Sequence, residues 1–224
     1  VYKRQPTIKI SRSSDGVVAD FYADGSGNLG TGLNATGTPF RTWLGSQFRY
    51  PPAAMTGDST VISGKAYGNG TYISSASSVF NVNWVAYKAF DFINSGVNYS
   101  SSAAYDNVSW LYIVSISTIV NGVTYYGEWL QLQLPAAIVL SNYTIYGIAN
   151  NTSNARDLVL CASNDGNTWT LIDQRSQLAW PFADPAFRNF TVTRPLTTTY
   201  TYYRLICRAV TVNTSWQVIE LQLF

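Results

Sequence analysis

The chain contains no histidine among its 224 residues. Ser-His and Cys-His nucleophilic sites are therefore excluded, and the commonest general base and zinc ligand are both missing. A glycoside hydrolase needs only two carboxylates, but most of the 12 Asp and Glu residues stand in turn-like contexts such as Asp24-Gly25 and Asp165-Gly166. The sequence favours a non-enzymatic protein, with a carboxylate glycosidase as the alternative enzyme class.

Charge is also scarce, because only 12% of the residues are charged and the 14 Lys and Arg residues are scattered along the chain. This pattern argues against a nucleic-acid tract and against a polybasic membrane patch. No apolar run approaches the roughly 20 residues that a membrane helix needs. The chain starts at Val1 without a signal peptide, which indicates a processed or truncated start.

The sequence has only two cysteines, Cys161 and Cys207, and each lies inside an apolar, strand-like run. A disulfide between facing strands is one interpretation, and two separate buried thiols are the other. With no histidine beside either thiol, we expect no nucleophilic role.

Aromatic residues are abundant at 15% of the chain, as are Ser, Thr, Asn and Gly, a profile typical of an all-β extracellular or virion-surface protein. The stretch GEWLQLQLP at 127–135 alternates apolar and polar residues, as a half-buried strand does. We expect Trp129 and the three leucines to face a core, Gln131 and Gln133 to face away, and Pro135 to end the strand.

Similar runs recur with turn signals between them, and only residues 83–93 look helical. Asn121-Gly122 and Asp165-Gly166 are expected to be two-residue hairpin connectors. This pattern predicts a sandwich or jelly roll. The predicted strands cover residues 72–77, 109–120, 124–135, 142–149, 156–165, 168–175, 187–194, 200–212 and 216–224.

The first part of the chain has a different texture, with short apolar clusters separated by Gly, Asn, Ser and Asp. We expect a hairpin in DFYADGSGNLGT, with Gly25 and Gly27 in its turn. The predicted organisation is an N-terminal hairpin or linker at residues 1–60 and a main domain at 61–224. So small a hairpin suggests an attachment or homo-oligomerisation segment.

Several short motifs occur in a fixed order over residues 70–224. Their residues are Ala89 and Asp91; Trp129, Leu130, Gln131 and Leu134; Ser163, Asp165, Gly166 and Trp169; Tyr203, Arg204 and Leu205; and Glu220 and Leu221. In that order they resemble the coagulation factor 5/8 type C, or discoidin-like, galactose-binding-like domain, in the style of surface and fibre proteins of large DNA viruses. The family's common disulfide between the domain ends has no counterpart here.

The resemblance implies a discoidin-like jelly-roll β-sandwich with a ligand site among the loops at one end, often for a terminal sugar such as galactose. A sugar needs an aromatic ring against its apolar face and planar polar groups for its hydroxyls. Three loops offer that mixture. The candidate glycan-binding residues are Asn83, Trp84 and Tyr87; Asn151, Asn154, Arg156 and Asp157; and Trp180 and Phe182.

The resemblance also implies a structural calcium ion near the start of the domain; no other cofactor is expected. Calcium requires hard oxygen ligands. The candidates are Asp91, Asn94 and Asp106, with Glu220 added by the resemblance. Arg204 and Glu220, on the terminal strands, are expected to form an internal ion pair.

The leading hypothesis is a non-enzymatic adhesion module on a virion or cell surface that binds host glycans or glycoproteins. The alternative is a structural minor capsid or fibre component whose loops contact other virion proteins. An excess of Asn-x-Ser/Thr triplets indicates a glycosylated, secreted surface. The triplets begin at Asn34, Asn69, Asn98, Asn107, Asn142, Asn150, Asn151, Asn189 and Asn213.

Overall fold

The computed structural model describes residues 7–11, 18–22, 48–93, 98–149, 152–182, 186–192 and 197–224. The chain divides into two compact units, Val1–Phe48 and Arg49–Phe224. In the first unit, β1 (Thr7–Ser11) and β2 (Val18–Tyr22) pair as an antiparallel hairpin. The turn predicted at Gly25 and Gly27 lies outside the described residues.

The second unit begins before the boundary that the sequence predicted at residue 60. Tyr50 forms an antiparallel bridge with Leu223, and Met55 is buried in the hydrophobic core. Residues 49–60 therefore belong to the sandwich, and the boundary moves to residues 48 and 49.

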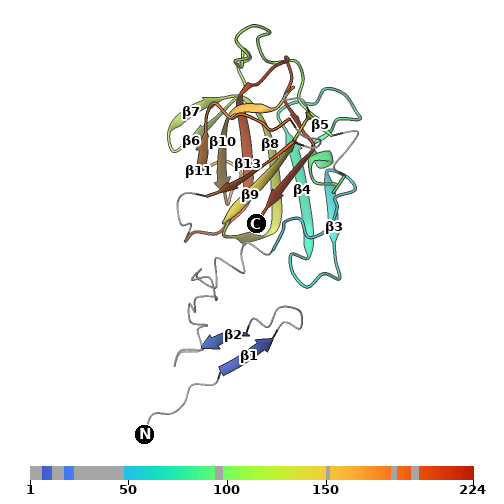
Figure 1. Ribbon diagram of the computed structural model, residues 1–224, viewed down its shortest axis with the longest axis vertical. Helices are drawn as coiled ribbons and strands as arrows, with labels where there is room; N and C mark the ends of the chain where they lie inside the picture. The colour runs from blue at the N-terminus through green and yellow to red at the C-terminus, as the bar shows by residue number, and fades with distance from the viewer. Residues whose placement is uncertain are drawn as a thin grey trace. The chain divides into compact units, whose positions relative to one another are not determined.

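The larger layer of the Arg49–Phe224 unit is a six-stranded antiparallel sheet (Figure 1). The strands lie in the order β11-β10-β13-β8-β4-β3, so the two longest strands, β13 and β8, occupy its middle. The strands are β3 (Ser59–Ile62), β4 (Gly70–Ala76), β8 (Glu128–Ile138), β10 (Ala155–Ser163), β11 (Thr170–Arg175) and β13 (Tyr200–Val210).

The second layer is a three-stranded sheet in the order β12-β9-β15. Two short pairs, β5 with β14 and β6 with β7, complete the strands of this unit, and residues 83–93 form only a 3-10 turn, η1. None of the helices in the described segments is both long and apolar enough to cross a membrane. The elements are β9 (Asn142–Gly147), β12 (Ala186–Thr191), β15 (Glu220–Leu223), β5 (Tyr99–Ser100), β14 (Gln217–Val218), β6 (Ser117–Val120), β7 (Val123–Tyr126) and η1 (Ala86–Ala89).

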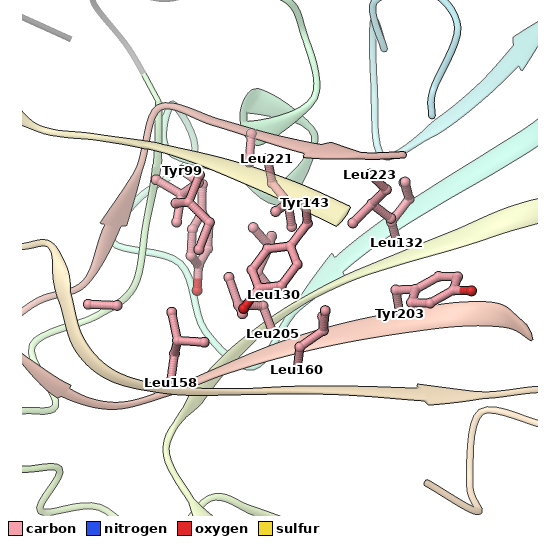
Figure 2. Close-up of a cluster of buried hydrophobic side chains, with 14 of the residues drawn as sticks. Tyr99, Leu130, Leu132, Tyr143, Leu158, Leu160, Tyr203, Leu205, Leu221 and Leu223 are labelled. Carbon is pink, nitrogen blue, oxygen red and sulfur yellow. The ribbon is translucent and has the colours of Figure 1, made fainter. Parts of the chain in front are cut away.

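The main core fills the space between the two layers. Figure 2 shows Tyr143 of β9 and Leu221 of β15 pointing toward Leu130 of β8 and Leu205 of β13. All four side chains are at most 2% exposed. Burying a leucine side chain fully contributes about 2 kcal/mol to the free energy of folding, so the packing of these side chains holds the two layers together. The predicted all-β sandwich is confirmed.

Trp129 differs from its prediction, because it lies on the opposite face of β8 from the leucines, together with Gln131. On that outer face the guanidinium of Arg204 lies 4.0 Å from the Trp129 ring centroid and 4.2 Å from that of Trp169. Its nitrogens donate to Oε1 of Gln131 and Oγ1 of Thr118. A second hydrophobic cluster, partly under the β6–β7 hairpin, surrounds this stack.

The predicted ion pair between Arg204 and Glu220 is wrong. Arg204 is held by two aromatic faces and two neutral acceptors, whereas Glu220 pairs with Arg49. Two stacked rings stabilise a partly desolvated guanidinium without a carboxylate.

Pro135 does not end β8, which continues to Ile138. The register against β13 shifts between Gln133 and Ile138, and the ladder with β4 stops at Gln133. The missing amide of the proline therefore removes no ladder hydrogen bond, which is how a proline is tolerated inside a sheet.

One predicted turn is confirmed and the other is longer than expected. Asn121 (φ 48°) and Gly122 (φ 80°) connect β6 to β7 as a two-residue hairpin. Asp165 and Gly166 instead belong to a longer connection between β10 and β11, in which the Asp165 carboxylate accepts bonds from the amides of Asn167 and Thr168.

The two cysteines are free and buried, on opposite sides of the six-stranded sheet. Cys161 packs in the outer cluster with Trp169, whereas Cys207 packs in the main core. Their side chains therefore cannot meet, which decides between the two sequence interpretations in favour of separate thiols. Burial raises the pKa of the Cys161 thiol to about 12 and raises that of Cys207 as well.

We predict that neither thiol of the folded protein reacts with an aromatic disulfide reagent at neutral pH, because both are buried and protonated. In denaturant without reductant both thiols should react. If the two cysteines failed to react in denaturant and reacted only after a reductant was added, they would be joined by a disulfide, and this arrangement would be wrong.

Candidate functional site

The antiparallel topology places five connecting segments at one end of the six-stranded sheet. β4, β11 and β13 end there, while β8 and β10 begin there. We call these segments, residues 77–85, 100–116, 152–157, 176–182 and 211–217, the loop end. Hydrogen bonds tie them together: the amides of Ser100, Ser101, Ser153 and Leu178 donate to the carbonyls of Trp84, Trp216, Val212 and Arg156, respectively.

The first predicted loop carries the clearest exposed aromatic surface. The Trp84 ring is partly exposed and meets the Phe80 ring edge to face, with centroids 6.3 Å apart. Phe80 is 59% exposed, and Asn83 beside it is exposed as well. Sequence reasoning missed Phe80, although its place four residues before Trp84 in a polar loop was a usable signal.

Tyr87, from the same predicted set, contributes mainly to the packing of the domain. It lies on η1, its ring packs against the main core, and its amide donates to the carboxylate of Asp58 at 3.0 Å. Its partly buried ring contributes less surface to solvent than Phe80 does.

Arg156 and Asp157 begin β10 and remain partly exposed at the loop end. Nε of Arg156 lies 3.5 Å from Oδ2 of Asp157, and its Nη1 donates to the Ser109 carbonyl at 3.3 Å. Oδ1 of Asp157 accepts from the amide of Gln177 at 2.7 Å. These bonds link three loops and leave part of the guanidinium facing solvent.

Asn154 is not a surface residue, because its side chain is fully buried. Its Oδ1 accepts from the amide of Ile148 and its Nδ2 donates to the Ile148 carbonyl. A Cβ on Gly147 would lie 2.3 Å from Asn154 Oδ1, so only glycine permits this approach. Asn154 holds the loop in shape, and Asn151 lies outside the described residues.

The third loop divides its two aromatic residues between core and solvent. Trp180 is 4% exposed, and its indole nitrogen donates to the Ala155 carbonyl at 2.7 Å. Phe182 is 82% exposed. Trp180 is thus an anchor for the loop, and Phe182 is the accessible ring.

Sequence reasoning also missed an aliphatic surface, because residues 109–116 were predicted to be strand. They form most of a loop in which Val108, Leu111 and Ile113 are 79%, 49% and 67% exposed. Asp106 stabilises its start by accepting bonds from the amides of Val108 and Ser109, and these bonds lower the pKa of its carboxyl.

The three calcium candidates that the structure describes, Asp91, Asp106 and Glu220, are not assembled into a cage. Asp106 caps its own turn, and Asn94 lies outside the described residues. Oδ1 of Asp91 accepts from the Ile93 amide, while its Oδ2 lies 3.4 Å from Nζ of Lys88. Within the described segments, no group of three or more acidic or cysteine side chains could hold a metal ion.

Glu220 does not fit a calcium site either, because both of its carboxylate oxygens are engaged. Oε1 pairs with Arg49, and Oε2 accepts from the amide of Phe92. Each candidate side chain that the structure describes therefore already has protein partners, so these side chains do not form a ready set of calcium ligands.

The remaining acids are likewise committed to local bonds, which argues against a carboxylate pair poised for hydrolysis. A catalytic pair needs two carboxyl groups facing one cleft. Each described acidic side chain instead accepts a hydrogen bond or pairs with a cation: Asp58, Asp91, Asp106, Glu128, Asp157, Asp165, Asp173 and Glu220.

The architecture is a discoidin-like, or galactose-binding-like, jelly roll, which confirms the fold that the sequence predicted and does not bear on the viral context. The CBM32-3 module of a family 31 glycoside hydrolase from Clostridium perfringens is similar, with a TM-score of 0.50 and 14% identity over 81% of this chain and 97% of that module.

Two further modules from Clostridium perfringens show the same likeness. CpGH89CBM32-5, solved in complex with GalNAc-β-1,3-galactose, has a TM-score of 0.49 and 16% identity over 68% of this chain and 94% of its own. The family 32 module of NanJ, solved with galactose, has a TM-score of 0.46 and 16% identity over 68% and 92%. Only the likeness to the CBM32-3 module supports the fold, and at 14% identity it supports nothing beyond the fold. No protein-family model matches the sequence, and no curated protein matches it.

We predict that Asn154→Ala lowers the free energy of unfolding by roughly 1 to 3 kcal/mol, because it leaves the two Ile148 backbone groups without partners. Asn83→Ala, an exposed amide in the neighbouring loop, should change it by less than about 0.5 kcal/mol. Urea denaturation of both variants tests the assignment, and equal effects would contradict it.

Proposed function

We propose that this protein is a non-enzymatic glycan-binding module whose recognition surface lies at the loop end. The observation that carries the proposal is the Phe80–Trp84 ring pair, which is exposed beside the Asn83 amide. It combines an aromatic face with a planar hydrogen-bonding group on one loop.

This combination suits a sugar for a physical reason. One face of a pyranose ring presents C–H groups, which pack on an aromatic ring, while its hydroxyls require fixed donors and acceptors. The sandwich holds the loop in place, because the carbonyl of Ser100 accepts a hydrogen bond from the amide of Phe80 and the amide of Ser100 donates to the carbonyl of Trp84. A loop held in this way loses little conformational entropy when it binds.

Two further groups extend the proposed surface. Phe182 offers a second, highly exposed ring, and Arg156 with Asp157 offers a charged pair for hydroxyl or carboxylate groups of a glycan. The structural similarity to the CBM32-3 module is in accord with this proposal but rests on the fold.

We place the module on a virion or cell surface, where it would adhere to host glycans. The support is compositional: few charges, many aromatic residues, and abundant Ser, Thr and Asn. Partners would be cell-surface glycans or glycoproteins, with the N-terminal hairpin as an attachment or oligomerisation segment.

A second candidate function, a structural capsid or fibre component, is favoured by one specific observation. Val108, Leu111 and Ile113 form an exposed aliphatic surface on one loop, while Trp110 and Tyr112 between them pack against the main core. Such a surface suits a protein partner better than a sugar.

Under this alternative, Val108→Asp would prevent incorporation into the particle and leave glycan binding intact.

The test of the first function is a glycan-array screen of the full chain, displayed multivalently to offset weak single-site affinity. We expect selective binding that falls roughly tenfold or more in Phe80→Ala and in Trp84→Ala, because each removes one ring of the platform. Val61→Ala is the control, since Val61 is 72% exposed on β3 and pairs with Thr71 at the start of β4, at the end of the sheet opposite the loop end.

An array with no bound glycan, obtained with folded protein, would overturn the proposed function. Equal losses in Phe80→Ala and Val61→Ala would instead overturn the site, because they would indicate nonspecific adhesion through exposed apolar side chains.

A further inference from the structure

Glu220 is a buried carboxylate in a position that joins distant parts of the domain. It is the first residue of β15, it is 0% exposed, and its register partner on β9 is Tyr146. An ionised carboxylate in such a place costs several kcal/mol unless a counter-charge and hydrogen bonds compensate it.

Both kinds of compensation come from sequence-distant residues. The guanidinium of Arg49 pairs with Oε1 of Glu220, and the amide of Phe92 donates to Oε2 at 3.1 Å. The same guanidinium lies 3.4 Å from the centroid of the Phe92 ring. Phe92 holds a φ of 63°, a conformation that costs energy and that the surrounding contacts must stabilise.

The charges around this pair are also matched. Asp91 lies close enough for its negative charge to oppose that of Glu220, but Asp91 has its own cation, Lys88, at 3.4 Å. Tyr146 and Tyr67 lie near Arg49. Each of the two buried carboxylates is therefore neutralised by a basic side chain of the chain itself.

The pair also sits where the domain closes. Tyr50, the residue after Arg49, donates its amide to the Leu223 carbonyl of β15 at 2.8 Å. A few residues later, the Met55 amide donates to the Phe90 carbonyl, just before Asp91, at 2.9 Å. The start of the domain, the loop after η1 and the last strand all converge on Glu220.

We propose that the guanidinium of Arg49 takes the role of a structural cation, so that this domain folds and stays folded without a divalent metal ion. The arginine supplies the positive charge, its stacking on Phe92 orders the loop after η1, and its place in the chain fixes the start of the domain to β15. This inference is independent of glycan binding.

The ionisation of Glu220 shows what Arg49 contributes. Burial raises the pKa of this carboxyl, and the Arg49 guanidinium and the Phe92 amide work against that rise. The charged form of Glu220 therefore depends on Arg49, and removing the guanidinium should raise the pKa of Glu220 further.

The first arm of the test uses the unaltered full chain and measures its thermal unfolding midpoint in calcium and in chelator. We expect the two midpoints to agree within experimental error, and calorimetric titration with calcium to give no binding heat. A midpoint that falls in chelator and recovers with calcium, but not with magnesium, would overturn the proposal.

The second arm removes the guanidinium while keeping an unbranched side chain. Arg49→Met should lower the unfolding midpoint by roughly 5 °C or more, because it leaves a buried carboxylate unpaired. Adding Glu220→Gln should recover part of that loss. Arg208→Met is the matched control, since Arg208 is an exposed arginine near the Tyr125 ring and should leave the midpoint unchanged.

The pH dependence separates a charge role from simple packing. A carboxyl whose folded pKa exceeds its unfolded value makes the folded state bind more protons, so stability falls as pH rises between the two values. Burial already raises the pKa of Glu220 to about 8 in the unaltered chain, so Arg49→Met should lose additional stability only above about pH 8, and the double variant should not. Parallel pH profiles for all three proteins would show that Arg49 acts only by packing and would overturn the proposal.

Discussion

The contact between the six-stranded and three-stranded sheets is the interaction on which the rest of the structure depends. Every second residue of β8, from Leu130 to Leu134, is buried against the second layer, to which Tyr143 and Leu221 belong. Because strand side chains alternate, this packing also decides what lies on the other face. The Arg204 stack between Trp129 and Trp169 is a direct consequence of that alternation.

The protein solves the problem of buried charge in two different ways. Arg204 lies against two indole rings and donates to neutral acceptors, which suits a cation that remains partly solvated. Glu220, which is fully buried, is instead paired with an opposite charge, that of Arg49. The difference follows from desolvation, because a carboxylate has no aromatic counterpart to a cation–π contact and depends on donors.

The strands were predictable because their signal is local. Period-two alternation and turn residues located most of the longer strands but missed β3 and β5, and Asn121-Gly122 was correctly predicted as a hairpin turn. The errors arose where tertiary context decided the outcome. Pro135 was tolerated by a register shift in β13, and residues 109–116 stayed out of the sheet despite their strand-like composition. Nothing in the neighbouring sequence specifies either event.

The loop residues were the hardest to predict for the same reason. Asn154 and Trp180 are of residue types that often bind sugars, but Gly147 leaves room for their side chains to pack inward. There they form hydrogen bonds with backbone groups. Phe80 and Phe182 remain outside because the described structure gives them no comparable buried partner. A polar or aromatic residue in a loop can thus hold the loop or face a ligand, and burial separates the two roles. At this end of the sandwich, the anchors fix the loops from beneath, and the exposed rings remain available for the ligand recognition that we propose.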